Sequence, residues 1–164
     1  MAMESDTNES MSPTERFLSL RRIAVAGVSR EPGTHGANVV YRRLRERGYT
    51  VFAVNPSAER VEGDACYRDL RSIPGSVDGV VIGTPPSATG SVVREAKELG
   101  IRHVWMHQGP APGSVSPDAV EYCRANGMDV IPGGCPCMFG PTADGVHRVM
   151  RFVLQLTGGV PRGI

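Results

Sequence analysis

A loop of small residues follows the first apolar run of the sequence, and its composition suits the binding of phosphate. The run 22–26 is rich in small and β-branched apolar residues, and residues 27–30 read Gly-Val-Ser-Arg. Residues 31–36 contain proline and two glycines and disfavour a helix, whereas residues 37–47 favour one. A buried strand, such a loop and a helix bring phosphate oxygens to backbone N–H groups at the helix N-terminus. We therefore predict that residues 27–36 bind the phosphates of an adenine nucleotide.

Small or hydrogen-bonding residues also follow the other predicted strands. Ligands of an open parallel sheet bind beyond the carboxyl ends of its strands, so these residues are candidates for the same binding site. They include few acids or bases, and neither a Ser–His–Asp set nor a carboxylate pair stands there. We therefore predict a ligand-binding protein with no catalytic residues of its own. The candidate residues are Gly27, Val28, Ser29, Arg30, Gly36, Asn55, Pro56, Thr84, Pro85, Pro86, Gln108, Gly109 and Cys135.

The loop departs from the pattern that binds NAD. The dinucleotide fingerprint requires G-x-G-x-x-G and an acidic residue after the second strand, which binds the ribose hydroxyls. Ser29 stands where the second glycine is required, and the second strand ends in Asn55 with no acid. Both departures count against NAD. Arg30 suits a ligand with an additional phosphate, since its guanidinium grips phosphate through charge-assisted hydrogen bonds.

Three predicted helices each end at a glycine that leads directly into a strand. Gly48, Gly100 and Gly127 are typical of the left-handed position that follows a helix. Strands that alternate with helices of this length predict parallel β-α-β units with right-handed crossovers. The fold class is therefore α/β, a doubly wound parallel sheet with helices on both faces. We expect helices at 12–20, 37–47, 87–99 (capped by Ser87) and 116–125, and strands at 23–26, 49–54, 77–83, 101–106 and 128–131.

Residues 57–76 interrupt this alternation. A turn is expected at 62–64, a short edge strand at 65–67 and a single helical turn at 69–74. The helix at 37–47 carries a run of basic residues, which we interpret as a face exposed to solvent. Its members are Arg42, Arg43, Arg45 and Arg47.

Composition indicates a cytoplasmic protein of one domain. The 164 residues are 40% hydrophobic and 21% charged, with a net charge of +1, which argues against a large nucleic-acid interface. No apolar run approaches the roughly 18 residues of a membrane span, and the acidic N-terminus is unlike a signal peptide. Four cysteines in such a chain are expected as free thiols. We expect a disordered tail at 1–11, the domain at 12–140, and a C-terminal helix at 141–164, packed on the domain or at an interface.

Three segments together resemble the small stand-alone coenzyme A-binding proteins. They are 24–30 (AVAGVSR), 48–56 (GYTVFAVNP) and 105–109 (WMHQG). The chain is also similar to the coenzyme A-binding domain of the succinyl-CoA synthetase α subunit, over residues 14–140. The resemblance implies a Rossmann-like domain that binds coenzyme A as its ligand.

The resemblance also implies roles for the candidate residues. The nucleotide is expected over Gly27, Ser29 and Arg30, with Asn55 and Pro56 on the adenosine side. The run Thr84-Pro85-Pro86 is expected to flank the pantetheine. The sequence departs from the family pattern at 131–137, where it has a glycine pair and a second cysteine. It lacks a glycine-rich histidine segment for phosphorylation, so the synthetase chemistry is not carried over.

Several alternatives stay open at this stage. One alternative is an enzyme, either an NAD(P)-dependent oxidoreductase or one subunit of an acyl-CoA ligase that acts with a partner protein. As a binding protein, the chain is open to assembly as a homodimer or with a partner protein. A sensor is a further alternative, in which Cys135 forms a mixed disulfide with coenzyme A. Cys66 and Cys123 are interpreted as structural. A zinc site of Cys135, Cys137 and His107 is not predicted, because zinc-binding cysteines are usually separated by two to four residues.

Overall fold

The structure is a computed structural model that describes residues 10–31, 35–109 and 113–139, together with 148, 149, 152, 153 and 156. Residues 1–9 of the predicted tail and most of the predicted C-terminal helix lie outside the described residues. The five described positions after 139 are exposed. Among the described residues, no helix is both long enough and apolar enough to cross a membrane.

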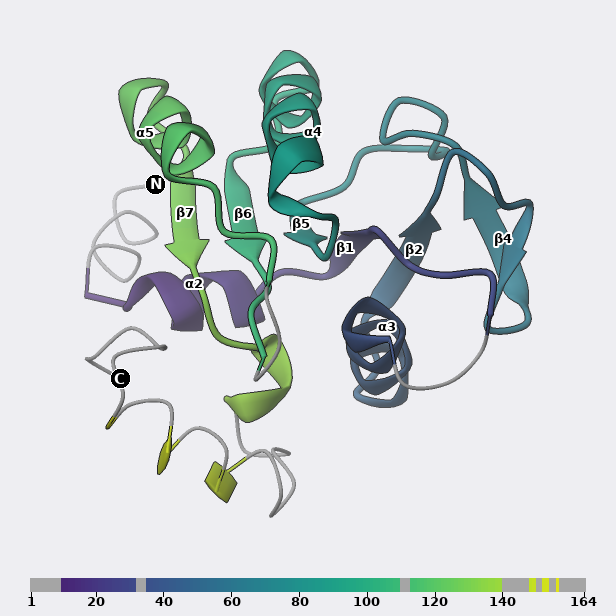
Figure 1. Cartoon of the computed structure of the whole chain (residues 1–164), viewed down its shortest axis with the longest axis horizontal. Coiled ribbons are helices and arrows are strands. Elements are labelled where there is room, and N and C mark those ends of the chain that lie inside the picture. The colour runs from purple at the N-terminus through teal and green to yellow at the C-terminus, as the bar shows by residue number, and fades with distance from the viewer. Residues whose placement is uncertain are drawn as a thin grey trace, which may run out of the picture.

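The described strands form one sheet in the order β3-β4-β2-β1-β5-β6-β7, as Figure 1 shows. All neighbours are parallel except β3 and β4, which form an antiparallel hairpin. The chain therefore adopts the predicted Rossmann-like α/β fold. The strands are β1 (Arg22–Ala26), β2 (Thr50–Val54), β3 (Arg60–Val61), β4 (Asp64–Tyr67), β5 (Gly79–Ile82), β6 (His103–Met106) and β7 (Asp129–Pro132).

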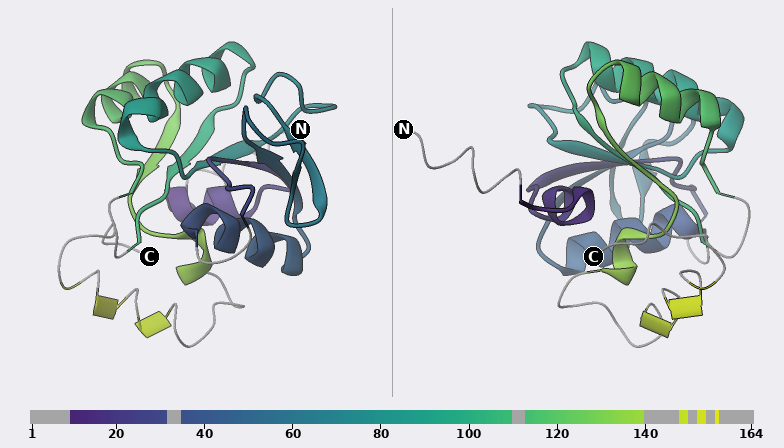
Figure 2. Two further views of the ribbon diagram at one scale, coloured as in Figure 1. Left: turned by 45° about the vertical axis from the view of Figure 1, so that its right-hand side comes forward. Right: turned by 90° about the vertical axis from the view of Figure 1, so that its left-hand side faces the viewer.

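Helices cover both faces of the sheet (Figure 2). Strand β1 shows why, because its residues alternate between two buried clusters. Ile23 and Val25 pack toward α3, and Ala24 and Ala26 pack toward α4 and α5. One face carries α2 (Pro13–Leu18), α3 (Gly36–Glu46) and the 3₁₀ turn η1 (Pro136–Met138), and the other carries α4 (Pro86–Glu98) and α5 (Pro117–Ala125).

The helix starts follow local chemistry, with one correction. Ser12 and Glu15 form a capping box at α2, and the Ser116 hydroxyl accepts a hydrogen bond from the Ala119 N–H at α5. The prediction that Ser87 caps α4 is wrong, because the N-cap is Pro85, two residues earlier, and the helix begins at Pro86. Pro86 has the fixed φ that suits the first helical position, so it begins the helix.

Two further expectations are corrected in the region after β2. The segment 69–74 forms turns and bends without a helical turn, and the Asp69 carboxylate accepts hydrogen bonds from Ser72. The basic side of α3 is also more than a solvated face. Arg45 pairs with Asp64 of the hairpin at 2.6 Å, and Arg47 donates to the carbonyl oxygens of residues 136, 137 and 139. These arginines fasten the hairpin and η1 to α3.

Asp64 gives the fold an acid-sensitive contact. The Tyr41 hydroxyl donates to Asp64 at 2.7 Å, and this bond, with Arg45, lowers the pKa of the Asp64 carboxyl. A lowered pKa stabilises the fold above the unfolded value of about 3.9, and that stability is lost as the pH falls through the folded value. We expect Asp64→Asn to destabilise the protein at pH 7 and to match the wild type more closely at pH 3. Urea midpoints at pH 7, 5 and 3 check this, and parallel pH curves for the two proteins contradict it.

Candidate functional site

The candidate site lies where the strand order reverses, between the carboxyl ends of β1 and β5. Strand β2 lies on one side of β1 and β5 on the other, so the loops after β1 and β5 leave the sheet next to each other. Gly27 has φ +87°, and a Cβ there would lie 2.5 Å from the carbonyl carbon of Gly83 and 2.6 Å from the amide nitrogen of Thr84. A Cβ on Gly83 would meet the Cβ of Ala37 at 2.6 Å. Glycine at 27 and 83 thus allows the two loops and the start of α3 to come together.

The N-terminus of α3 contributes backbone donors to this site. The N-cap residue His35 makes no side-chain capping bond. The N–H groups of Gly36, Ala37 and Asn38 make no hydrogen bond to the described residues, as expected for a first helical turn. His107, from the end of β6, lies against this turn, since a Cβ on Gly36 would be 2.7 Å from its Cε1 atom. The first turn of α3, the β1 loop and the ends of β5 and β6 therefore share one location.

Two amides of the loop after β1 already have partners within the protein. The Gly27 N–H donates to the Val54 carbonyl at 3.1 Å, and the Ser29 N–H donates to the side-chain oxygen of Asn38 at 2.7 Å. Val28 is buried, Ser29 is half-buried, and Arg30 is exposed. The N–H groups of Val28 and Arg30 make no hydrogen bond to the described residues, so these two amides and the first turn of α3 are the donors left for a phosphate.

Asn55 ties the end of β2 to the same loop. Its Nδ2 group donates to the Val28 carbonyl at 2.7 Å, and its Oδ1 atom accepts from the Ser57 N–H at 2.7 Å. The side chain of Asn55 therefore holds two loops in place, and each of its polar atoms has capacity for one more bond. Pro56, the next residue, is exposed at the same end of the sheet.

The remaining candidates divide into two groups. Thr84 is half-buried beside the exposed Pro85 and Pro86, so this run leads from β5 into α4. Gln108 and Gly109 are half-buried after β6, and the Gln108 N–H donates to the Gly134 carbonyl at 2.9 Å.

Cys135, the last candidate, is buried in the core. Its side chain is 5% exposed and packs in the buried cluster on the α3 face. A hydrogen bond with Cys137 and burial raise the pKa of the Cys135 thiol well above its ordinary value. Burial also raises the pKa of Cys123 to about 11. A thiol in this setting is poorly ionised, which disfavours the disulfide exchange required of a sensor.

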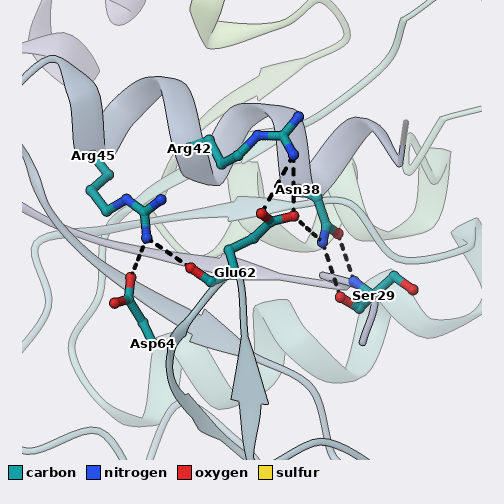
Figure 3. A network of polar contacts seen from close by, with 6 residues as sticks. All are labelled: Ser29, Asn38, Arg42, Arg45, Glu62 and Asp64. Carbon is teal, nitrogen blue, oxygen red and sulfur yellow. Dashed lines mark hydrogen bonds and ion pairs between the residues drawn. The ribbon is translucent and has the colours of Figure 1, made fainter. Parts of the chain in front are cut away.

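Two residues that sequence reasoning missed connect the loop to the rest of the fold. Asn38 is fully buried in α3, and its side chain bonds to both the N–H and the carbonyl of Ser29. Glu62, in the hairpin turn between β3 and β4, accepts from Asn38 and from Arg42 (Figure 3). An asparagine inside an amphipathic helix pattern was the available sign, but its partners stand 9 and 24 residues away.

Comparison with known proteins agrees with this architecture. The acetate–CoA ligase (ADP-forming) I of Archaeoglobus fulgidus is 35% identical over 127 residues, covering 74% of this chain and 18% of the ligase. The α subunit of acetate–CoA ligase (ADP-forming) II of Pyrococcus furiosus is 30% identical over 126 residues, covering 73% of this chain and 27% of the subunit. The chain thus spans a fifth to a quarter of these ligases.

A small solved protein and a family profile cover more of the chain. A hypothetical protein from Pyrococcus horikoshii superposes with a TM-score of 0.70 at 27% identity, covering 78% of this chain and 89% of that one. The sequence profile of the CoA binding domain matches residues 21–141, which include every strand and the whole candidate site. The chain belongs to the CoA binding domain family.

Proposed function

We propose that the protein binds coenzyme A or an acyl-CoA at the carboxyl ends of β1 and β5 and has no catalytic activity by itself. The observation that carries this proposal is the uncapped first turn of α3, which meets the β1 and β5 loops at the switch in strand order. Amide donors and the positive end of the helix dipole favour a diphosphate there. The family assignment selects coenzyme A among the ligands that carry a diphosphate.

The parts of the ligand are assigned as follows. The diphosphate lies at the N–H groups of Gly36 and Ala37, which make no hydrogen bond to the described residues, and within reach of the loop after β1, where those of Gly27 and Ser29 are already paired. Val28 and Arg30 extend this loop, and Arg30 contributes charge to a phosphate. The adenosine lies toward Asn55 and Pro56. The pantetheine runs along Thr84, Pro85 and Pro86, toward Gln108 and Gly109, while Cys135 stays in the core.

Calorimetric titration of the purified protein tests this assignment. We expect coenzyme A to bind and to raise the melting temperature, with NAD and NADP giving no shift at the same concentration. Binding of NAD or NADP with no binding of coenzyme A would overturn the proposal. Nicotinamide reduction by the protein alone would contradict the non-catalytic role.

Arg30→Gln gives a sharper test of the phosphate contact. Arg30 is exposed, so the substitution leaves the fold intact and removes only charge and donors. We expect the dissociation constant for coenzyme A to rise about tenfold, equivalent to about 1.4 kcal/mol. Arg124→Gln, at an exposed arginine of α5, is the matched control and should bind as the wild type does. Equal affinities for both variants remove Arg30 from the site.

A second candidate function is the CoA-binding part of an acyl-CoA ligase that acts with a separate chain. The observation that favours it is the match to a ligase α subunit, of which this chain spans only 27%. Ligase activity then requires a partner. Affinity purification from the native cell, followed by an assay of acyl-CoA formation with ATP, distinguishes this function from simple binding.

A further inference from the structure

The loop after β1 is clamped by a single buried side chain. The Oδ1 atom of Asn38 accepts the Ser29 N–H at 2.7 Å, and its Nδ2 group donates to the Ser29 carbonyl at 2.9 Å. Both backbone groups of one residue are therefore satisfied by one amide, as they would be by a neighbouring strand. Asn38 is 0% exposed, so water does not compete for these bonds.

Glu62 fixes which way this amide points. Its Oε1 atom accepts from Nδ2 of Asn38 at 2.9 Å, and Arg42 lies 3.4 Å from the same carboxylate (Figure 3). The Glu62 side chain is 8% exposed. Because an ionised carboxylate only accepts, the nitrogen of Asn38 must face it, which turns the oxygen of Asn38 to the Ser29 N–H.

Glu62 has a backbone conformation that is unfavourable for a residue with a side chain. Glu62 and Gly63 form the two-residue turn between β3 and β4, with φ values of +51° and +83°. Both central positions of such a turn need positive φ, and Asn or Gly normally fills the first. Among the described residues, Glu62 is the one non-glycine with positive φ. A costly conformation retained at one point indicates that the residue serves a function there.

We propose that Asn38 and Glu62 are positioning residues that hold the loop after β1 in the conformation that binds the diphosphate of coenzyme A. This inference rests on the proposed function. Ser29 precedes Arg30, and Asn38 stands in the first turn of α3, so the clamp sets the distance between the loop and the helix N–H groups. Without the clamp, the ligand must order the loop as it binds, and the affinity falls.

Glu62→Asn separates this role from a general contribution to stability. Asparagine adopts the positive φ of this turn at a lower cost, which stabilises the fold. Its shorter side chain no longer reaches Asn38, which destabilises the fold, so the two effects on stability offset each other. We expect a melting temperature within about 4 °C of the wild type. We expect the dissociation constant for coenzyme A to rise about tenfold and the Ser29 amide to exchange with solvent at least about tenfold faster.

Asp64→Asn is the matched control. Asp64 stands two residues away in the same hairpin and also contacts α3, through Tyr41 and Arg45, but it makes no hydrogen bond to Asn38 or Ser29. This variant should lose stability and keep the wild-type affinity for coenzyme A. Asn38→Asp is a second variant at the clamp, since a carboxylate cannot donate to Ser29 or Glu62. Its affinity should fall at least as far as that of Glu62→Asn.

The outcomes are distinguishable. Wild-type affinity in Glu62→Asn and in Asn38→Asp overturns the inference and leaves the proposed function standing. An equal loss of affinity in Asp64→Asn also overturns it, because the effect then follows from loosening the hairpin. No binding of coenzyme A by the wild type refutes the proposed function, and this inference with it.

Discussion

Gly27→Ala is expected to lower the free energy of unfolding by about 3 kcal/mol or more and to abolish binding of coenzyme A. The Cβ would lie 2.5 Å from the carbonyl carbon of Gly83 and 2.7 Å from its oxygen, both in the backbone of the neighbouring loop. Positive φ costs a side chain about 1–2 kcal/mol, and overpacking adds about 1–3 kcal/mol. Urea unfolding measures the loss, and titration with coenzyme A measures the effect on binding.

Gly48→Ala is the control that separates the cost of backbone strain from the cost of the steric clash at Gly27. Gly48 has φ +92°, similar to Gly27, but a Cβ there meets nothing within 4 Å. Its cost is therefore the backbone strain alone, about 1–2 kcal/mol. The difference between the two variants measures how tightly the loops after β1 and β5 are apposed. Equal losses would show that these loops can separate without cost, which contradicts the geometry described for the site.

The alternation of strands and helices could be predicted from the sequence, because the residues that determine it act on their near neighbours in the chain. Gly48, Gly100 and Gly127 have φ values of +92°, +76° and +66°, and each follows a helix as predicted. The apolar run 23–26, predicted to be a buried strand, lies within β1, and the turn at 62–64 falls at the β3–β4 hairpin. A glycine after a helix and an apolar run between turns act through residues within a few positions, so they need no knowledge of the fold.

The polar contacts that shape the site could not be read in this way. Asn38 looks like an ordinary helical residue until the fold brings Ser29 and Glu62 to it. Arg47 likewise looks solvated in a basic run, yet it bonds to carbonyls about 90 residues later in the chain. The sequence also cannot show which loop amides are already paired. This pairing removes the N–H groups of Gly27 and Ser29 from the proposed diphosphate contacts.

Trp105, the one tryptophan of the sequence, links the buried core to the loops that follow β6 and β7. Trp105 of β6 is 0% exposed, lies 5.4 Å from Phe17 and 5.6 Å from Phe139 between ring centroids, and donates from Nε1 to the Gly133 carbonyl at 3.0 Å. The next carbonyl, of Gly134, accepts the Gln108 N–H. Trp105 thus anchors the loop after β7 that in turn holds the loop after β6.

Trp105→Ala should destabilise the protein by about 4 kcal/mol, and Trp105→Phe by about 2–3 kcal/mol. The alanine variant loses the aromatic contacts and leaves a cavity. The phenylalanine variant keeps most of the ring and leaves the buried Gly133 carbonyl without its donor. Circular dichroism must follow unfolding, since both variants lack the chain's one tryptophan.

Tyr49→Phe is the control for Trp105→Phe, because it also removes a side-chain donor from a backbone carbonyl. The Tyr49 hydroxyl donates to the Leu18 carbonyl at 2.6 Å, and the side chain is half-buried. Its removal should cost about 1 kcal/mol, because water can reach the carbonyl that it leaves. A larger loss for Trp105→Phe than for Tyr49→Phe follows from the burial of Gly133. Equal losses would mean that the Gly133 carbonyl finds another donor, and the Trp105 bond would then not be what anchors the loop after β7.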